Sequence, residues 1–334
     1  MEKENILELN QLKTQFITKD KTVTAVNEVS YHIKKGEILG LVGESGCGKS
    51  VTALSIMQLF KDTPGKITSG EVNFKGKNLV GLSNKEMSKV RGKDISMIFQ
   101  EPMSSLNPTM KIGVQMMELI LKHEKMSKNQ AYNLALSMLE KVGIPRAKEV
   151  MNEYPHQLSG GMNQRVGIAM GMSLNPSLLI ADEPTTALDV TIQAQILELM
   201  REINQEFGMS ILLITHDLGV VAEMCDRVVV MYAGKVVEEA NVYDLFANPK
   251  HPYTKGLLAS TPVIGKRAKR LDSIPGNVPS LDNMPKGCPF ASRCAQCFAK
   301  CEEEMPPTFL HEDEHGIRRS RCWLAKEGNI GLEV

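Results

Sequence analysis

A glycine-rich segment near the N-terminus carries residue types and a spacing that could bind phosphate. The segment Gly43-Glu44-Ser45-Gly46-Cys47-Gly48-Lys49-Ser50 fits the pattern G-x-x-x-x-G-K-[ST]. Its glycines allow backbone N–H groups to turn toward a phosphate, and a helix that starts there adds positive potential. Lys49 can reach the β- and γ-phosphates of a nucleotide, and the Ser50 hydroxyl can ligate Mg²⁺. We therefore predict an ATP and Mg²⁺ site formed by Gly43, Ser45, Gly46, Cys47, Gly48, Lys49, Ser50 and Val51, with Cys47 as a small filler residue.

Two acidic residues end an apolar run farther along the chain. The run Leu178-Leu179-Ile180-Ala181-Asp182-Glu183 has the composition of a buried strand followed by two carboxylates. By themselves, the two acids could be a solvated strand end. Together with the glycine-rich segment they predict ATP hydrolysis, in which Asp182 holds Mg²⁺ through its hydration shell and Glu183 polarises the attacking water.

Alternating strand and helix patterns supply the elements that would position these residues. The apolar run ILGLVG precedes the glycine-rich segment, and an apolar helical run at 50–60 follows it. Residues 6–42 predict short strands, SLLIAD and MSILLIT predict buried strands, and a long helix is expected at about 190–207. RVVVMYAGKVVEE predicts a hairpin. This alternation predicts an α/β fold with a mostly parallel sheet covered by helices.

A change of composition and periodicity near residue 250 predicts two domains. The chain has 334 residues, which is long for one hydrophobic core. Beyond about residue 250, helical periodicity fades while prolines and five of the seven cysteines gather. We therefore expect a main domain at 1–250 and a C-terminal extension at 251–334.

Charge and hydropathy narrow the functional classes. Lys plus Arg equals Asp plus Glu at 39 each, and this balance disfavours a general nucleic-acid binder, which usually carries a basic surplus. No apolar run approaches the roughly 18 residues of a membrane span. The N-terminal residues MEKENILELN lack a basic region followed by an apolar one, so we predict no signal peptide and a cytosolic protein.

A second glycine-containing segment indicates a family. Leu158-Ser159-Gly160-Gly161-Met162 read alone is a flexible loop with a helix-capping serine. It also resembles the signature loop of the ABC ATPase family, and further motifs follow in that family's order. Gln100 resembles the Q-loop glutamine, Ala187-Leu188-Asp189 the D-loop, and His216 after ILLIT the switch histidine. The resemblance covers about residues 5–245 and implies a P-loop core, an antiparallel β subdomain and a helical subdomain at about 101–165.

The resemblance also implies a mechanism that needs two ATPase domains. They would pair head to tail, with ATP between the Gly43–Ser50 loop of one and Ser159, Gly160, Gly161 and Met162 of the other. Catalytic roles fall to Glu183, His216 and Lys49, while Gln100 would sense Mg²⁺ and the coupled partner. Phe16 lies where the family's adenine-stacking aromatic usually falls, with core packing as the alternative. Met162 departs from the usual glutamine, but its flanking donors are intact.

Two loops and the tail resemble the D-subunit type of ATPase in oligopeptide and dipeptide importers. These are Glu101–Pro108, Pro184–Thr191, and a tail with His251-Pro252-Tyr253-Thr254, Ile274-Pro275-Gly276 with Pro279, Gly287-Cys288-Pro289-Phe290 and Arg293-Cys294. The implied function is ATP-driven import of di- or oligopeptides from the cytoplasmic face of the membrane. The implied partners are a second ATPase subunit, two membrane permeases and, indirectly, an external peptide-binding protein.

Alternative functions within and beyond this family stay open at this point. The second ATPase is expected to be a different chain, although a homodimer is possible in isolation. Nickel and oligosaccharide importers share the core motifs. An ABC-type ATPase that acts on nucleic acid is a rival of another class, but only about 110 residues separate Ser50 from Ser159, too few for the long coiled coil of such proteins.

The clustered cysteines predict a metal or cluster site. In a reducing compartment such a cluster favours metal binding over disulfides. Cys288, Cys294, Cys301 and Cys322 resemble the pattern that holds a [4Fe–4S] cluster in some peptide-importer ATPases. Cys297 is left as an extra or substitute ligand. It forms C-x-x-C with Cys294, a spacing common in zinc sites, so zinc and free thiols remain alternatives.

Overall fold

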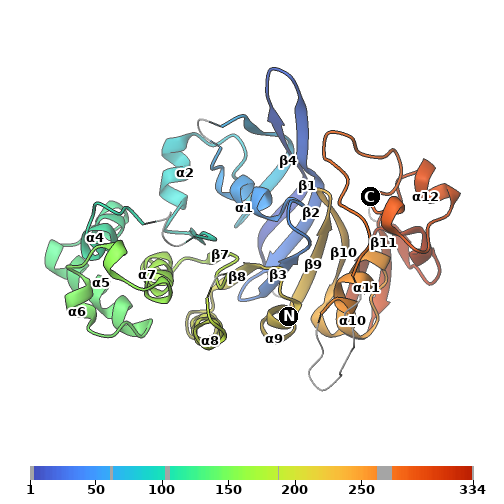
Figure 1. The fold of residues 1–334 in the computed structure, drawn as a ribbon. Helices are drawn as coiled ribbons and strands as arrows, with labels where there is room; N and C mark the ends of the chain where they lie inside the picture. The colour runs from blue at the N-terminus through green and yellow to red at the C-terminus, as the bar shows by residue number, and fades with distance from the viewer. Residues whose placement is uncertain (1–3, 61–62, 102–105, 187, 262–272, 333–334) are drawn as a thin grey trace. The chain divides into compact units, whose positions relative to one another are not determined.

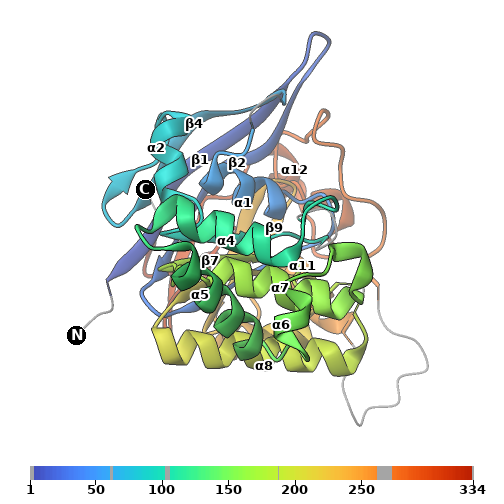
Figure 2. The same ribbon diagram turned by 90° about the vertical axis from the view of Figure 1, so that its left-hand side faces the viewer.

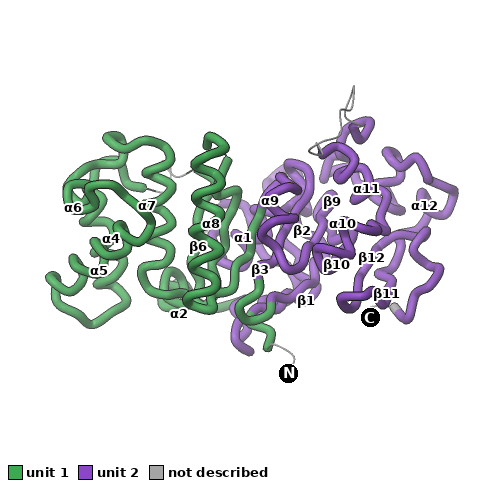
Figure 3. The backbone as a smooth tube through the Cα atoms, turned by 90° about the horizontal axis from the view of Figure 1, so that it is seen from below, with its two compact units in different colours: residues 1–6, 34–37, 81–214 green, residues 7–33, 38–80, 215–334 purple. Residues whose placement is uncertain are grey.

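The computed structural model describes residues 4–60, 63–101, 106–186, 188–261 and 273–332. The chain divides into two compact units, shown in different colours in Figure 3. Unit 1 comprises residues 1–6, 34–37 and 81–214, and unit 2 comprises residues 7–33, 38–80 and 215–334. Each unit is built around β-strands with helices packed on them, which confirms the predicted α/β class.

An antiparallel sheet in unit 2 has the order β2-β1-β4-β5. Its strands are β1 (Asn5–Ile17), β2 (Thr22–Lys34), β4 (Gly65–Phe74) and β5 (Lys77–Asn78). The prediction of short strands was wrong for β1 and β2, which have 13 residues each. Strand β1 continues because a bulge near Gln11, whose φ is 50°, absorbs the extra residues and bends the strand.

The second group of strands in unit 2 contains the predicted hairpin. Strand β3 (Ile38–Val42) is buried along its whole length and pairs in parallel with β9 (Arg227–Tyr232). Strand β9 pairs antiparallel with β10 (Lys235–Asn241), as expected from RVVVMYAGKVVEE. Beyond β10 follow β12 (Gly316–Ser320), β11 (Phe309–Asp313) and β13 (Gly331–Leu332).

Residues on both sides of position 250 share this group of strands. Strand β12, from the C-terminal segment (residues 251–334), pairs with β10 through Glu238–Ser320 and Glu239–Arg319. The helices of unit 2 are α1 (Lys49–Met57), α9 (Leu218–Met224), α10 (Val242–Ala247), α11 (Pro252–Ala259) and α12 (Ala299–Glu303). The division into domains near residue 250 stays a prediction.

Unit 1 has a parallel sheet in the order β6-β7-β8. Its strands β6 (Ile95–Ile98), β7 (Leu178–Asp182) and β8 (Ser210–Ile214) are short and apolar, as a sheet covered on both faces requires. The long helix predicted at about 190–207 is confirmed as α8 (Val190–Phe207), which starts at the N-capping side chain of Asp189.

A helical subdomain belongs to unit 1. It contains α4 (Ile112–His123), α5 (Lys128–Lys141), α6 (Ala147–Val150) and α7 (Gly160–Met172), with α2 (Asn84–Val90) preceding it in the chain. Helices α4, α5 and α7 pack on one another through their apolar faces (Figures 1 and 2). The predicted helical region is present, and its last helix runs beyond residue 165 to Met172. Within the described ranges, no helix has both the length and the apolar composition to cross a bilayer.

Candidate functional site

The glycine-rich loop joins β3 to α1 in unit 2. Gly43, Gly46 and Gly48 have φ angles of 150°, 79° and 105°, values that L side chains rarely adopt. A Cβ at Gly48 would also stand 2.5 Å from the carbonyl oxygen of Ala25. Helix α1 starts directly after Gly48, and no side chain caps its N-terminus. These φ angles and the uncapped start of α1 suit a phosphate-binding loop, in which backbone N–H groups at a helix N-terminus bind the anion.

Lys49 is folded into this loop. Its side chain is buried, and its Nζ donates to the carbonyl oxygens of Gly43 at 2.6 Å and Glu44 at 3.1 Å. Cys47 is fully buried with its Sγ 3.8 Å from the same Nζ, and burial raises the pKa of its thiol. These positions favour the filler role for Cys47. Ser50 and Val51 follow in the first turn of α1 and are half-buried.

Two further predicted residues lie in unit 2. His216 is exposed and follows the end of β8 by two residues. Phe16, near the end of β1, is half-buried, and its ring forms a T-shaped contact with Phe60, with centroids 6.2 Å apart. This contact is compatible with both alternatives for Phe16, so its role in adenine stacking stays a prediction.

The acidic pair and the Q-loop glutamine lie together in unit 1. Asp182 is buried at the end of β7, and Glu183 follows it with a φ of 47°. The Glu183 Oε2 atom accepts from Gln100 Nε2 at 2.8 Å and from Thr186 Oγ1 at 2.9 Å. Strands β6 and β7 are parallel neighbours, so the residues that follow them emerge at the same edge of the sheet. Thr186 was missed, although it belongs to the segment Pro184–Thr191.

The signature residues form the N-terminus of α7. Ser159 is the N-cap, with Oγ accepting from the Met162 N–H at 3.3 Å. Ser159 and Gly160 are exposed, and a Cβ on Gly160 would meet open space. A Cβ on Gly161 would lie 3.0 Å from Ile192 Cγ2, so packing against α8 favours glycine there. The arrangement presents a hydroxyl and helix-terminal N–H groups to solvent, which suits an anionic ligand. Ala187 of the D-loop and Pro102–Ser105 lie outside the described residues.

Four of the five clustered cysteines line one cavity in unit 2. This cavity of about 20 Å³ is bounded by Cys288, Cys294, Cys301 and Cys322, together with His251, Gln296 and apolar side chains, whereas Cys297 is not among its lining residues. Burial, with the neighbouring thiols, raises the pKa of Cys288 and of Cys322 to about 11. In the part of the chain that the structure describes, no group of His, Cys, Asp or Glu has the compact arrangement of a metal-ion site.

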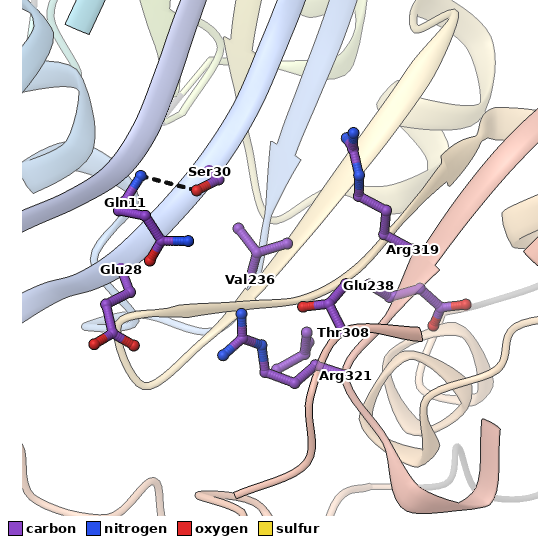
Figure 4. Close-up of a pocket in the computed structure, with 9 residues that line it drawn as sticks. Gln11, Glu28, Ser30, Val236, Glu238, Thr308, Arg319 and Arg321 are labelled. Atoms are coloured by element: carbon purple, nitrogen blue, oxygen red, sulfur yellow. Dashed lines mark hydrogen bonds between the residues drawn. The ribbon is translucent and has the colours of Figure 1, made fainter. Parts of the chain in front are cut away.

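A second, polar cavity lies in unit 2 between the N-terminal strands and the C-terminal segment (Figure 4). It is lined by Gln11, Glu28, Ser30, Val236, Val237, Glu238, Thr308, Arg319 and Arg321. Its charged groups have partners: Glu28 pairs with Lys235 at 3.0 Å, and Arg319 with Glu239 at 3.0 Å. We assign this cavity to the packing of the C-terminal segment and not to catalysis.

A contact between the C-terminal segment and the glycine-rich loop was missed by sequence reasoning. Arg293 forms two hydrogen bonds with the carboxylate of Glu44, from which it is separated by 249 residues in the chain. Both residues belong to unit 2. No local sequence signal connects them, because the contact depends on the folded path of the C-terminal segment.

Comparisons with known proteins give consistent results along the chain. Residues 26–186 match the family model described as ABC transporter, and residues 237–301 match that of the oligopeptide/dipeptide transporter C-terminal region. The oligopeptide transport ATP-binding protein AppD of Bacillus subtilis (strain 168) is 53% identical, covering 96% of this chain and 97% of the relative. The dipeptide transport ATP-binding protein DppD of the same organism is 52% identical, covering 96% and 95% respectively.

The larger part of the chain also resembles solved structures of ABC-type proteins. A dimeric, post-hydrolysis structure of the ATP-binding cassette MJ0796 bound to ADP and Pi superimposes with a TM-score of 0.64 at 28% identity. The match covers 71% of this chain and 98% of that cassette. The structure of cbiO1 from Clostridium perfringens, part of the ABC transporter complex cbiONQ, matches with a TM-score of 0.62 at 28% identity, covering 74% of this chain and 92% of cbiO1.

Proposed function

This chain belongs to the ATP-binding proteins of ABC transporters, within the group of oligopeptide and dipeptide transport ATPases, and from that membership we propose that it energises peptide import. It is an ABC-type ATPase that binds ATP with Mg²⁺ and hydrolyses it. The substrates of the transporter are di- or oligopeptides, as named for its relatives. The observation that carries this proposal is the match of both the ATPase region and the C-terminal region to peptide-transport proteins.

In the proposed mechanism, Lys49 and the loop N–H groups bind the β- and γ-phosphates. Ser50, through its hydroxyl, and Asp182, through the hydration shell of the ion, would hold Mg²⁺, which when bound would supply neutralisation of the phosphate charge. Glu183 accepts a proton from the attacking water. The hydrogen bond from Gln100 supports this role, because it orients the carboxylate of Glu183. We further propose that His216 contacts the γ-phosphate.

A second ATPase subunit completes each nucleotide site in the proposed mechanism. Ser159, Gly160, Gly161 and Met162 of one subunit donate to the γ-phosphate held by the loop of the other. The N-capped start of α7 supports this assignment, since Ser159 and Gly160 are exposed there. ATP then joins the two subunits, and hydrolysis separates them. The partner is a related but different chain, and the pair acts at the cytoplasmic face of the membrane on two permease subunits, supplied by an external peptide-binding protein.

We also propose a [4Fe–4S] cluster on Cys288, Cys294, Cys301 and Cys322. Support comes from the single cavity that these four residues line and from the position of Cys297 outside it. Four thiolates suit such a cluster and also a structural zinc ion, so zinc is the alternative occupant. The contribution of the cluster would be to cross-link the segments that carry the cysteines.

Peptide uptake tests the proposed function. A strain that lacks this chain would be complemented with wild type or with Glu183→Gln and offered a labelled dipeptide, a longer peptide and Ni²⁺ in parallel. We expect wild type alone to restore peptide uptake. Uptake of Ni²⁺ without peptide would keep the ATPase role and overturn the substrate. ATP hydrolysis without any transport would overturn the importer function itself.

A further inference from the structure

The phosphate-binding loop carries an acidic residue, Glu44, whose carboxylate is held by the C-terminal segment. Arg293 donates from one terminal nitrogen to Glu44 Oε2 at 2.6 Å and from the other to Oε1 at 3.0 Å. The Arg293 side chain is 4% exposed and that of Glu44 is 30% exposed. This two-pronged geometry is the strongest form of an arginine–carboxylate contact.

We propose that Arg293 is a positioning residue for nucleotide binding, which neutralises Glu44 and holds its carboxylate away from the phosphates. The proposal rests on the assignment of Gly43–Ser50 as the ATP site. A free carboxylate in this loop would repel the negative charge of Mg-ATP, and partial burial weakens the solvent screening of that repulsion. The C-terminal segment would therefore set the affinity of the loop for nucleotide.

The surroundings of Arg293 fix it in place. It ends a short 3-10 helix, Ala291–Arg293, and its Nε donates to the carbonyl oxygen of Pro275 at 2.9 Å. Its guanidinium also lies over the rings of Tyr232 and Phe290, 5.8 and 5.9 Å from their centroids. Because these contacts already fix the rotamer of Arg293, binding the carboxylate costs little additional conformational entropy. Arg293 therefore has a fixed side-chain conformation that is ready to bind the Glu44 carboxylate.

Every polar group of Glu44 is engaged within the same unit. Its backbone N–H donates to Tyr253 Oη at 2.8 Å, and its carbonyl oxygen accepts from Lys49 Nζ at 3.1 Å. Tyr253 is fully buried on α11, where burial and hydrogen bonding keep its hydroxyl in place. Glu44 is therefore the residue at which the C-terminal segment and the phosphate-binding lysine meet.

An ion pair exposed to solvent would have little effect on nucleotide affinity. Exposed pairs contribute little to stability, and the pair between Lys21 and Asp282 is of that kind, with side chains 61% and 42% exposed and 3.4 Å apart. The Arg293–Glu44 pair is bidentate, with a buried arginine side chain and a half-buried carboxylate. Removing its cationic partner leaves a carboxylate without compensation next to the phosphate site.

A double-mutant cycle on the purified full-length chain tests the proposal. Dissociation constants for Mg-ATP and Mg-ADP would be measured by titration calorimetry for wild type, Arg293→Ala, Glu44→Gln and the double variant, with steady-state KM and kcat of ATP hydrolysis. We expect Arg293→Ala to raise the Kd of Mg-ATP and KM by about tenfold or more, with kcat within about threefold. Glu44→Gln in the Arg293→Ala background should recover most of the affinity, because the carboxylate that needs neutralising is gone.

Two further variants separate this effect from general loss of structure. Arg293→Lys keeps the positive charge without the fork and should fall between wild type and Arg293→Ala. Arg319→Ala removes another arginine–glutamate contact between the C-terminal segment and the core, the one with Glu239, away from the loop. It should leave nucleotide affinity unchanged.

Three outcomes would overturn the inference. They are wild-type affinity in Arg293→Ala, an equal loss in Arg319→Ala that follows the melting temperature, and a double variant as weak as Arg293→Ala. Failure of the wild-type chain itself to bind Mg-ATP would instead overturn the proposed function.

Discussion

Gln100 donates a hydrogen bond of 2.8 Å to the carboxylate of Glu183, which lies at the end of the neighbouring parallel strand. The same Oε2 atom accepts from Thr186, so two donors orient one carboxylate. Glu183 also has a φ of 47°, an unusual conformation for a residue with a side chain, and its N–H donates to the carbonyl oxygen of Ile214. These contacts hold the residue that we propose as the general base.

Replacement of Glu183 by glutamine should stop hydrolysis without loss of ATP binding. The amide has a similar shape but cannot accept a proton from water, and removal of a general base typically costs about 10²–10⁴ in rate. We expect a fall of at least about 100-fold in phosphate release. The variant should also accumulate an ATP-bound, associated state, which size-exclusion chromatography with and without ATP would reveal. Wild-type turnover would remove Glu183 from this role.

Loss of Gln100 should lower kcat more than it raises KM. Gln100→Ala removes a donor that orients Glu183, so about tenfold of kcat is expected to be lost while nucleotide affinity is largely kept. Thr186→Val removes the other donor and should act in the same direction. Steady-state kinetics of the purified variants would measure both constants. A change confined to KM would show that Gln100 binds nucleotide and does not act through Glu183.

A bulky residue at Ser159 should block association without affecting the loop that binds ATP. Ser159 is exposed at the start of α7, so Ser159→Arg introduces a long cation where a partner is expected to dock. In the Glu183→Gln background we expect ATP binding to persist and ATP-dependent association to disappear. Met162→Gln, which restores the usual family residue, is the matched control and should associate normally. Association of the Ser159→Arg variant would contradict the role of the signature in trans.

Alanine at two glycines of the phosphate-binding loop should have unequal effects. Gly46 has a φ of 79° and open space around a Cβ, so Gly46→Ala carries backbone strain only, of about 1 kcal/mol. Gly48→Ala adds a collision with the carbonyl oxygen of Ala25 and should cost about 2–3 kcal/mol of folding free energy. Denaturant unfolding and nucleotide titration would compare the two. Equal effects would show that the loop can shift away from Ala25.

Anaerobic purification should yield iron and acid-labile sulfide in near-equal amounts. Cys294→Ser and Cys301→Ser remove residues that line the cavity and should lose both elements. Cys297→Ser is the matched control, because Cys297 does not line the cavity, and it should keep them. Zinc in place of iron would establish the alternative metal. An absence of both metals from the wild-type protein would leave the cysteines as free thiols.

The residues proposed for the nucleotide site could be predicted from the sequence because they lie within short motifs. The glycines, Lys49 and Ser50 belong to one turn and the helix that it starts, and the proposed catalytic acids lie at the end of one apolar strand, Asp182 as its last residue and Glu183 as the next. Backbone conformation over such short spans follows directly from residue type, since glycine permits positive φ and apolar runs form buried strands. The hairpin of β9 and β10 and helix α8 were predicted for the same reason.

The tertiary structure decided which distant residues meet. In the folded chain, Gln100 contacts Glu183, β12 pairs with β10, and Arg293 contacts Glu44. One cavity is lined by Cys288, Cys294, Cys301 and Cys322 but not by Cys297. Each of these contacts depends on strand order and on the path of the chain across long sequence separations. Periodicity and spacing carry no information on that path, because the free energy of such contacts arises only when separate elements pack together.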